Sequence, residues 1–187
     1  MSRRWFNFKA EPRRRRALIL ACILFWSIIS YLLISHYAVG AGEVVGISMR
    51  PTLEDGERYL INRWIFRLRD PLPGEIVALH VYQEQGLSVK RVIALPEELV
   101  KIGEGSVYVN GKKLREPYLG PAVRTLGNGM SEKTYKVAED CYFVLGDNRS
   151  ESEDSRIFGA VPRSWIGGRV EVPEKANGYL RSSPRPL

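Results

Sequence analysis

The sequence predicts a mostly β protein, with a single N-terminal transmembrane helix followed by a compact domain built of antiparallel sheets. Two patterns point to this class. One uncharged apolar run lies near the N-terminus, and beyond it β-branched and aromatic runs alternate with Gly, Pro and Asn turns, with no long helical period. With 44% hydrophobic residues in 187, the chain is neither disordered nor collagen-like, and it has room for one domain with a real core.

The apolar run covers residues 17–35 and contains no charged side chain. As a helix it extends about 28 Å, the thickness of the hydrocarbon core of a bilayer. We therefore place a membrane span at residues 17–36. The alternative is a cleaved signal peptide, because small residues follow at Ala38 and Gly40. Signal peptides usually have a shorter apolar region, of about 7–15 residues, and the greater length here favours an uncleaved anchor.

The net charge of +7 is concentrated in the first 16 residues, which carry +6. The remaining residues carry only +1, which argues against a generally basic nucleic-acid-binding domain. Basic residues beside a span face the cytoplasm. The sequence thus predicts a cytoplasmic tail at residues 1–16 and an extracytoplasmic domain at residues 37–187. The expected partner is the lipid bilayer of the cell membrane, and no nucleic acid.

Eight segments of the outer domain are strand candidates, each bounded by turn residues. They are Arg58–Asn62, Glu75–Val81, Leu87–Leu95, Leu99–Ile102, Ser106–Val109, Tyr135–Val137, Cys141–Leu145 and Arg169–Val172. Asn110 and Gly111 predict a tight hairpin after Val109, because Asn-Gly readily adopts the positive φ angles of a type I′ turn.

The chain lacks the residues from which most common catalytic and metal sites are built. Only His36 and His80 are present, so a Ser-His-Asp triad and a zinc site are poorly supported. Cys22 and Cys141 make no disulfide framework. The acidic segment 147–154 lacks the Gly and Glu positions of an EF-hand, and no nucleotide-binding fingerprint occurs. We expect neither a metal nor a cofactor.

A lysine and a serine remain as candidates. Lys90 lies in a strand candidate, where a period of two places it on one largely apolar face with Ser88, Val92 and Ala94. Such a lysine loses hydration, which disfavours its ammonium form. Ser48 lies in a turn rich in backbone donors. From the residues alone, a solvated strand lysine and an ordinary turn serine are the favoured interpretations.

Three motifs, in order, resemble those of type I signal peptidases, membrane-bound Ser-Lys proteases that cleave signal peptides from exported proteins. Residues 48–53 match the Ser-Met-x-Pro-Thr-Leu motif, and residues 90–96 resemble the Lys-Arg-Val-x-Gly-Leu-Pro box. Residues 146–156 match the signature Gly-Asp-Asn-Arg-x-x-Ser-x-Asp-Ser-Arg throughout. Residues 109–119 are also similar to a family segment.

The resemblance implies a serine endopeptidase in which Ser48 is the nucleophile and Lys90 is the general base, acting through an acyl-enzyme on signal-peptide-bearing preproteins. Some relatives carry a serine two positions before the nucleophile that helps to form the oxyanion hole. Gly46 stands there in this chain and offers only its backbone, so the amide of Ser48 is the principal expected donor.

Further residues are implied as support for this dyad. Ser152 would hydrogen-bond the amine of Lys90 and orient it. Asp154 and Arg156 would form an ion pair, and Asp147 belongs to the same supporting loop.

The chain departs from the family pattern after the lysine. Ala94 stands where many members have Gly, and Glu97 and Glu98 replace the usual Gly-Asp, which affects loop geometry more than chemistry. Two alternatives stay open: a membrane-tethered β domain that binds proteins without catalysis, and a specialised conjugation-system or organellar peptidase of the same fold. A self-cleaving Ser-Lys repressor is disfavoured, because it would need a DNA-binding domain and the sequence predicts a transmembrane anchor in its place. The sequence does not determine the oligomeric state.

Overall fold

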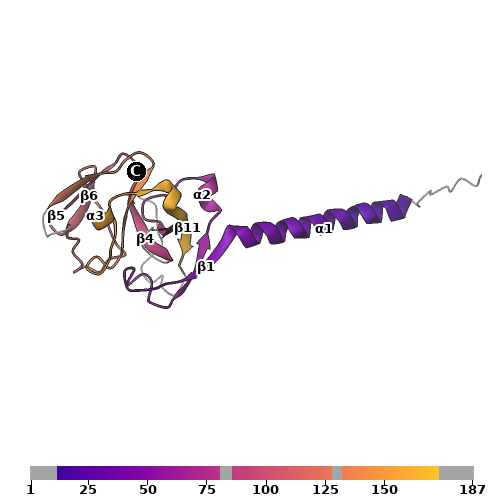
Figure 1. Ribbon diagram of the computed structural model, residues 1–187, viewed down its shortest axis with the longest axis horizontal. Coiled ribbons are helices and arrows are strands. Elements are labelled where there is room, and N and C mark those ends of the chain that lie inside the picture. Colours follow the sequence, from indigo (N-terminus) through magenta and orange to yellow (C-terminus); the bar gives the residue numbers. More distant parts are fainter. Residues whose placement is uncertain (1–11, 81–85, 128–131, 173–187) are drawn as a thin grey trace, which may run out of the picture. The chain divides into compact units, whose positions relative to one another are not determined.

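A computed structural model describes residues 12–80, 86–127 and 132–172 (Figure 1). It divides into two compact units, the first ending at Ala38 and the second beginning at Val39. The first unit contains the helix α1 (Pro12–Ala38), and the second contains every strand of the described residues. The predicted class, a mostly β protein of antiparallel sheets with one N-terminal apolar helix, is confirmed.

Helix α1 is longer than the predicted span. It begins at Pro12, a residue that suits the first turn of a helix because its missing N–H would have no intrahelical partner there. The stretch Arg13–Ile34 is long and apolar enough to cross a membrane, by length and composition. Residues 1–11 of the predicted basic tail lie outside the described residues.

The larger sheet has seven strands in the order β1-β2-β11-β3-β4-β9-β10, and every pair in it is antiparallel. Its strands are β1 (Val39–Glu43), β2 (Arg58–Asn62), β3 (Ile76–His80), β4 (Leu87–Ala94), β9 (Cys141–Leu145), β10 (Val161–Pro162) and β11 (Ile166–Glu171). Three short helical turns connect them: α2 (Ile65–Leu68), α3 (Ser155–Phe158) and the 3₁₀ turn η1 (Arg163–Trp165).

The smaller sheet has four strands in the order β7-β6-β5-β8. They are β5 (Leu99–Gly103), β6 (Ser106–Val109), β7 (Lys112–Lys113) and β8 (Lys133–Lys136). Figure 1 shows β5 and β6 at one end of the β domain and β1 at the other. The predicted Asn-Gly hairpin joins β6 to β7, with positive φ at both Asn110 and Gly111, as a type I′ turn requires.

The core lies on both faces of the larger sheet. In β3, Ile76 and Ala78 belong to one buried cluster, while Val77 and Leu79 belong to another. Because side chains alternate along a strand, the two clusters cover opposite faces. A third cluster, which includes Phe143, joins the end of β4 and β9 to the smaller sheet. The central strands are therefore held rigidly, and β4 carries one of the two candidate catalytic residues.

The sequence missed two strands, β1 and β10, and half of β11. It also placed β8 two residues late. The glycines in β1 and β11 lowered the strand signal, yet close packing accounts for two of them. A Cβ at Gly42 would lie 2.6 Å from the Tyr59 ring, and one at Gly168 would lie 2.5 Å from a methyl of Ile61. Val81, the last residue of one predicted strand, lies outside the described residues.

Candidate active site

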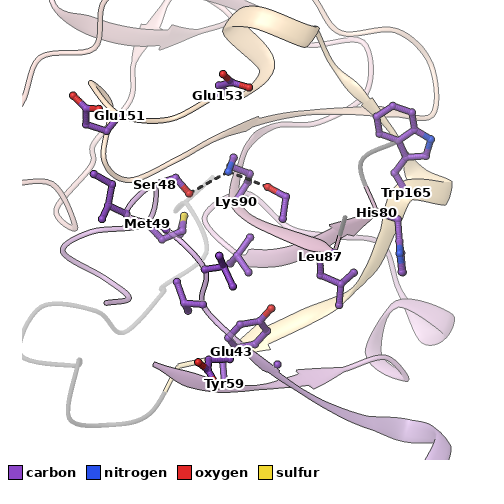
Figure 2. Close-up of a pocket in the computed structure, with 18 of the residues that line it drawn as sticks. Glu43, Ser48, Met49, Tyr59, His80, Leu87, Lys90, Glu151, Glu153 and Trp165 are labelled. Atoms are coloured by element: carbon purple, nitrogen blue, oxygen red, sulfur yellow. Dashed lines mark hydrogen bonds between the residues drawn. The ribbon is translucent and has the colours of Figure 1, made fainter. Parts of the chain in front are cut away.

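The structure brings Ser48 and Lys90 together, although 42 residues separate them in the chain. The amine Nζ of Lys90 lies 3.2 Å from Ser48 Oγ and 3.0 Å from Ser88 Oγ. Figure 2 draws both hydrogen bonds as dashed lines, with the amine between the two hydroxyls. Lys90 is only 4% exposed, whereas Ser48 is half-buried and open to the adjacent pocket. A buried amine in contact with an accessible hydroxyl has the geometry of a base beside a nucleophile.

The strand β4 determines where the amine lies. In the ladder with β3, Lys90 is opposite Val77 and Ser88 is opposite Leu79, and both of those apolar residues are fully buried. Side chains two residues apart on a strand lie on the same face, so the strand geometry makes Ser88 and Lys90 neighbours. The face is apolar apart from these two groups, which disfavours a charged amine.

Buried side chains anchor the turn that carries Ser48. Met49 and Leu53 are 1% and 0% exposed, and their burial anchors the turn while Ser48 projects into the pocket. Gly46 donates its N–H to Asp55 at 2.7 Å, so that amide is already engaged. The N–H of Ser48 has no acceptor among the described residues and is available as a donor to an oxyanion.

Asn148 fastens this turn to the loop of residues 146–156. Its backbone N–H donates to the Ser48 carbonyl at 2.9 Å, and its side-chain Nδ2 donates to the Ile47 carbonyl at 3.1 Å. Two hydrogen bonds from one residue thus hold the two peptide units that flank Ser48, one of which contains the Ser48 N–H. The sequence identified Asn148 only as part of a motif.

We expect Asn148→Ala to slow any reaction at the Ser48 hydroxyl about tenfold, because one of the two bonds is lost and small displacements of a nucleophile are costly. Asn148→Asp should lose activity similarly, since a carboxylate cannot donate to the Ile47 carbonyl. The steady-state rate of the reaction at Ser48 and thermal melting of each variant provide the check. A near-normal rate in a well-folded Asn148→Ala protein would contradict this role.

Ser152 does not hold the Lys90 amine in the way that the resemblance implies. Its Oγ is buried and has no hydrogen-bond partner among the described residues. The hydroxyl lies against Gly146, where a Cβ would be 2.2 Å from Ser152 Oγ and 2.6 Å from the Ser48 carbonyl oxygen. Only glycine therefore permits this close approach of the two segments. The hydroxyl that does contact the amine, Ser88, was noted in the sequence only as a face neighbour.

Asp154 and Arg156 form a bidentate ion pair, with both oxygen–nitrogen distances at 2.8 Å. Asp154 is fully buried, and it also accepts from the Gly146 N–H at 3.0 Å and caps the first turn of α3. The pair therefore links α3 to the start of the loop that contacts Ser48.

Asp147 pairs with Arg91, which follows the candidate base directly. The contact is bidentate, at 2.9 Å to Nε and 2.6 Å to Nη2, and both residues are 2% exposed. Asp147 also accepts from the Thr52 hydroxyl, and the Arg91 guanidinium stacks over the Tyr118 ring. Burial alone would lower the pKa of Arg91, but the charge of Asp147 and the hydrogen bonds to it raise that pKa above its usual value.

Arg149 forms a third buried contact, with Glu116 and the Thr125 hydroxyl. Its Nε also donates to the Gly146 carbonyl at 3.0 Å. Burial opposes its charge, yet the pKa of Arg149 is raised because Glu116 bonds it and lies close by. The sequence did not identify Glu116 or Arg91 as part of this network, because ion pairs between distant segments leave no local pattern.

A pocket of about 1370 Å³ lies over the pair and runs between residues 42–49 and residues 86–90. Pockets for drug-sized molecules measure about 300–1,000 Å³, so this one has the capacity for a longer ligand. Figure 2 shows Glu151 and Glu153 beyond Ser48, and His80 and Trp165 beyond Leu87. Within the described ranges, no cluster of three or more His, Cys, Asp or Glu side chains has the geometry to hold a metal ion.

Comparisons with known proteins identify relatives along most of the chain. A family model described as "Signal peptidase, peptidase S26" matches residues 15–174. A probable signal peptidase I-2 of Synechocystis sp. is 37% identical over 171 residues, which cover 88% of this chain and 76% of that protein. A signal peptidase I of Bacillus caldolyticus is 35% identical over 170 residues, covering 86% of this chain and 90% of that protein.

Among solved structures, a signal peptidase I from Enterococcus faecalis V583 aligns with a TM-score of 0.46 and 30% sequence identity. The alignment covers 54% of this chain and 97% of that chain.

Proposed function

The chain belongs to the signal peptidase family, peptidase S26, and from this premise we propose that it removes signal peptides from exported preproteins with a Ser48–Lys90 dyad. Family membership makes it a serine peptidase. The observation that carries the finer proposal is the 3.2 Å contact between the Lys90 amine and the Ser48 hydroxyl in an open pocket.

In the first half of the proposed reaction, the neutral amine of Lys90 accepts the proton of Ser48 while Oγ bonds to the carbonyl carbon at the end of the signal peptide. The carbonyl oxygen becomes an oxyanion, and the proposed donor to it is the N–H of Ser48, which has no acceptor within the described residues. The C–N bond then breaks. The Lys90 ammonium returns its proton to the departing amine, which is the new N-terminus of the mature protein.

In the second half, Lys90 accepts a proton from a water molecule as the water attacks the acyl-enzyme ester. The bond between the acyl carbon and Ser48 Oγ breaks, and the proton returns to Oγ. The signal peptide leaves with a free carboxylate. A lysine can perform both steps because its buried position disfavours the ammonium form.

The walls of the pocket suit an extended peptide. In the part of β4 that lines the pocket, Leu87–Lys90 pair with β3 on one side, and pairing with β9 begins only at Arg91. The other edge of this segment is open toward residues 42–46. A signal-peptide end bound there as an added strand would gain main-chain hydrogen bonds, and shallow apolar pockets would select small side chains.

The proposed location is a membrane, with the N-terminus in the cytoplasm and the β domain outside. The support is a helix that is long enough to span and the basic run Arg13–Arg16 at its start. On the outer side the enzyme would meet signal peptides as they emerge from export, both confined to the same membrane plane.

The test is cleavage of a preprotein with an Ala-x-Ala site, followed by N-terminal sequencing of the product. We expect a single cut directly after the second Ala, both with detergent-solubilised protein and with sealed right-side-out vesicles. In sealed inverted vesicles the active site would lie in the lumen, out of reach of the added preprotein. These vesicles should therefore cleave it only after detergent has opened them.

Cleavage by intact inverted vesicles would overturn the proposed membrane orientation but not the proposed Ser48–Lys90 chemistry. No cleavage of any preprotein by folded, detergent-solubilised protein would overturn the proposed function. Conjugation-system and organellar substrates, assayed in parallel, test the alternative that this chain is a specialised peptidase of the same fold. A marked preference for one of these substrates would support that alternative over general preprotein processing.

A further inference from the structure

We propose that Ser88 is the positioning residue for the general base, holding the Lys90 amine so that its lone pair faces Ser48. The inference rests on the proposed function, because it deepens the role of the same site. Besides Ser48, Ser88 presents a hydroxyl to the amine, at 3.0 Å, and the side chains of Ser88 and Lys90 project from the same face of β4. Ser88 is buried and lines the pocket beside Lys90.

The geometry of an amine explains why such a contact matters. A neutral lysine has two N–H donors and one lone pair, and rotation about its last C–N bond can turn the lone pair in any direction. An acceptor at a defined position fixes one N–H and so restricts that rotation. With Ser88 Oγ accepting, the lone pair can face Ser48 Oγ at 3.2 Å on the other side of the nitrogen.

The backbone makes Ser88 a rigid acceptor. It lies opposite Leu79 in a ladder that is buried on both faces, two residues from Lys90 on the same strand. The distance between the two side chains is therefore determined within one strand and does not depend on how loops pack. Ser152, by contrast, reaches the site from the loop 146–156, and its buried Oγ is without a partner in the described ranges.

Ser88→Ala should lower kcat for preprotein cleavage about tenfold or more and leave KM within about twofold, because substrate contacts are retained. A hydroxyl accepts more strongly from an ammonium than from a neutral amine, so its loss favours the neutral base. The acid limb of the pH–rate profile should therefore move to lower pH, by about half a unit. Ser88→Thr, which keeps the oxygen, should restore most of the activity.

Three further proteins make the test specific. Ser106→Ala is a matched control, because Ser106 is a strand serine in the smaller sheet and does not line the pocket; it should cleave normally. Ser152→Ala should lose less kcat than Ser88→Ala, and its melting temperature should not fall, because no hydrogen bond is lost. Lys90→Ala reports on the dyad itself.

The outcomes separate the two proposals. Wild-type kcat and an unmoved acid limb in folded Ser88→Ala, with Lys90→Ala inactive, would overturn the role of Ser88 alone. A larger loss in Ser152→Ala than in Ser88→Ala would also overturn it. Activity in Lys90→Ala would overturn the dyad and the positioning role with it.

Discussion

Lys90→Ala is expected to reduce preprotein cleavage by at least about a thousandfold, with the β domain still folded. The amine is the group in contact with the Ser48 hydroxyl, and no other described Lys or His side chain hydrogen-bonds that hydroxyl. Ser48→Ala should cause an equal loss, because no other nucleophile occupies its position. The measurement is the cleavage rate of a preprotein under single-turnover conditions, which separates the chemical step from product release.

Three further measurements make this prediction more specific. The double variant Ser48→Ala/Lys90→Ala should lose no more activity than either single variant, because groups that act as a unit are strongly non-additive. Lys90→Arg should also be inactive, since a guanidinium stays protonated and cannot accept a proton. In the active enzyme, cleavage should rise with pH as the neutral amine becomes more populated.

Lys136→Ala is the matched control, because Lys136 is an exposed strand lysine in the smaller sheet, outside the pocket. It should cleave at the normal rate. The dyad would be wrong if Lys90→Ala cleaved within tenfold of the unmodified protein, or if the double variant lost far more activity than the single variants.

Asp147→Ala is expected to destabilise the β domain by about 3–5 kcal/mol, the largest loss of stability that we expect from any single substitution outside the hydrophobic core. It would leave the Arg91 guanidinium, which is 2% exposed, without its carboxylate. A buried, unpaired charge is far more costly than a broken surface pair. Denaturant unfolding of the detergent-solubilised protein would measure the loss.

Cleavage should fall with stability, because Asp147 also accepts from Thr52, in the turn that carries Ser48. Asp147→Asn tests the electrostatic part, since it keeps the volume and loses the charge. Glu132→Ala breaks an exposed ion pair with Lys101, and its cost should be less than about 1 kcal/mol. If Asp147→Ala destabilised the protein as little as Glu132→Ala does, the role assigned to the buried Arg91–Asp147 pair would be refuted.

The parts of the fold that depend on local pattern were predictable. The strands β2 and β9 have the predicted bounds, and the Asn110-Gly111 turn adopts the expected backbone angles. Strands containing glycine were missed or shortened, because propensity counts Gly against a strand. At Gly168 the neighbouring Ile61 leaves no room for a side chain, and that neighbour comes from a distant segment.

The candidate site divides in the same way. Ser48 and Lys90 were chosen from the sequence through their motifs, and the structure places them in contact. The network that surrounds them was not predictable, because Arg91–Asp147 and Arg149–Glu116 join segments that only folding brings together. The partner of the amine also differed from expectation, with Ser88 in contact and Ser152 not.

By itself the sequence determined the order of the chain, an apolar span followed by a β domain, and the two residues that bear the proposed chemistry. These follow from hydropathy, from alternation and from motif residues that are local in the chain. The tertiary structure decided which hydroxyl meets the amine, which backbone donor stays open and which charges are buried in pairs. Such contacts depend on distances of a few ångströms between segments far apart in the sequence, and only the packed sheets define those distances.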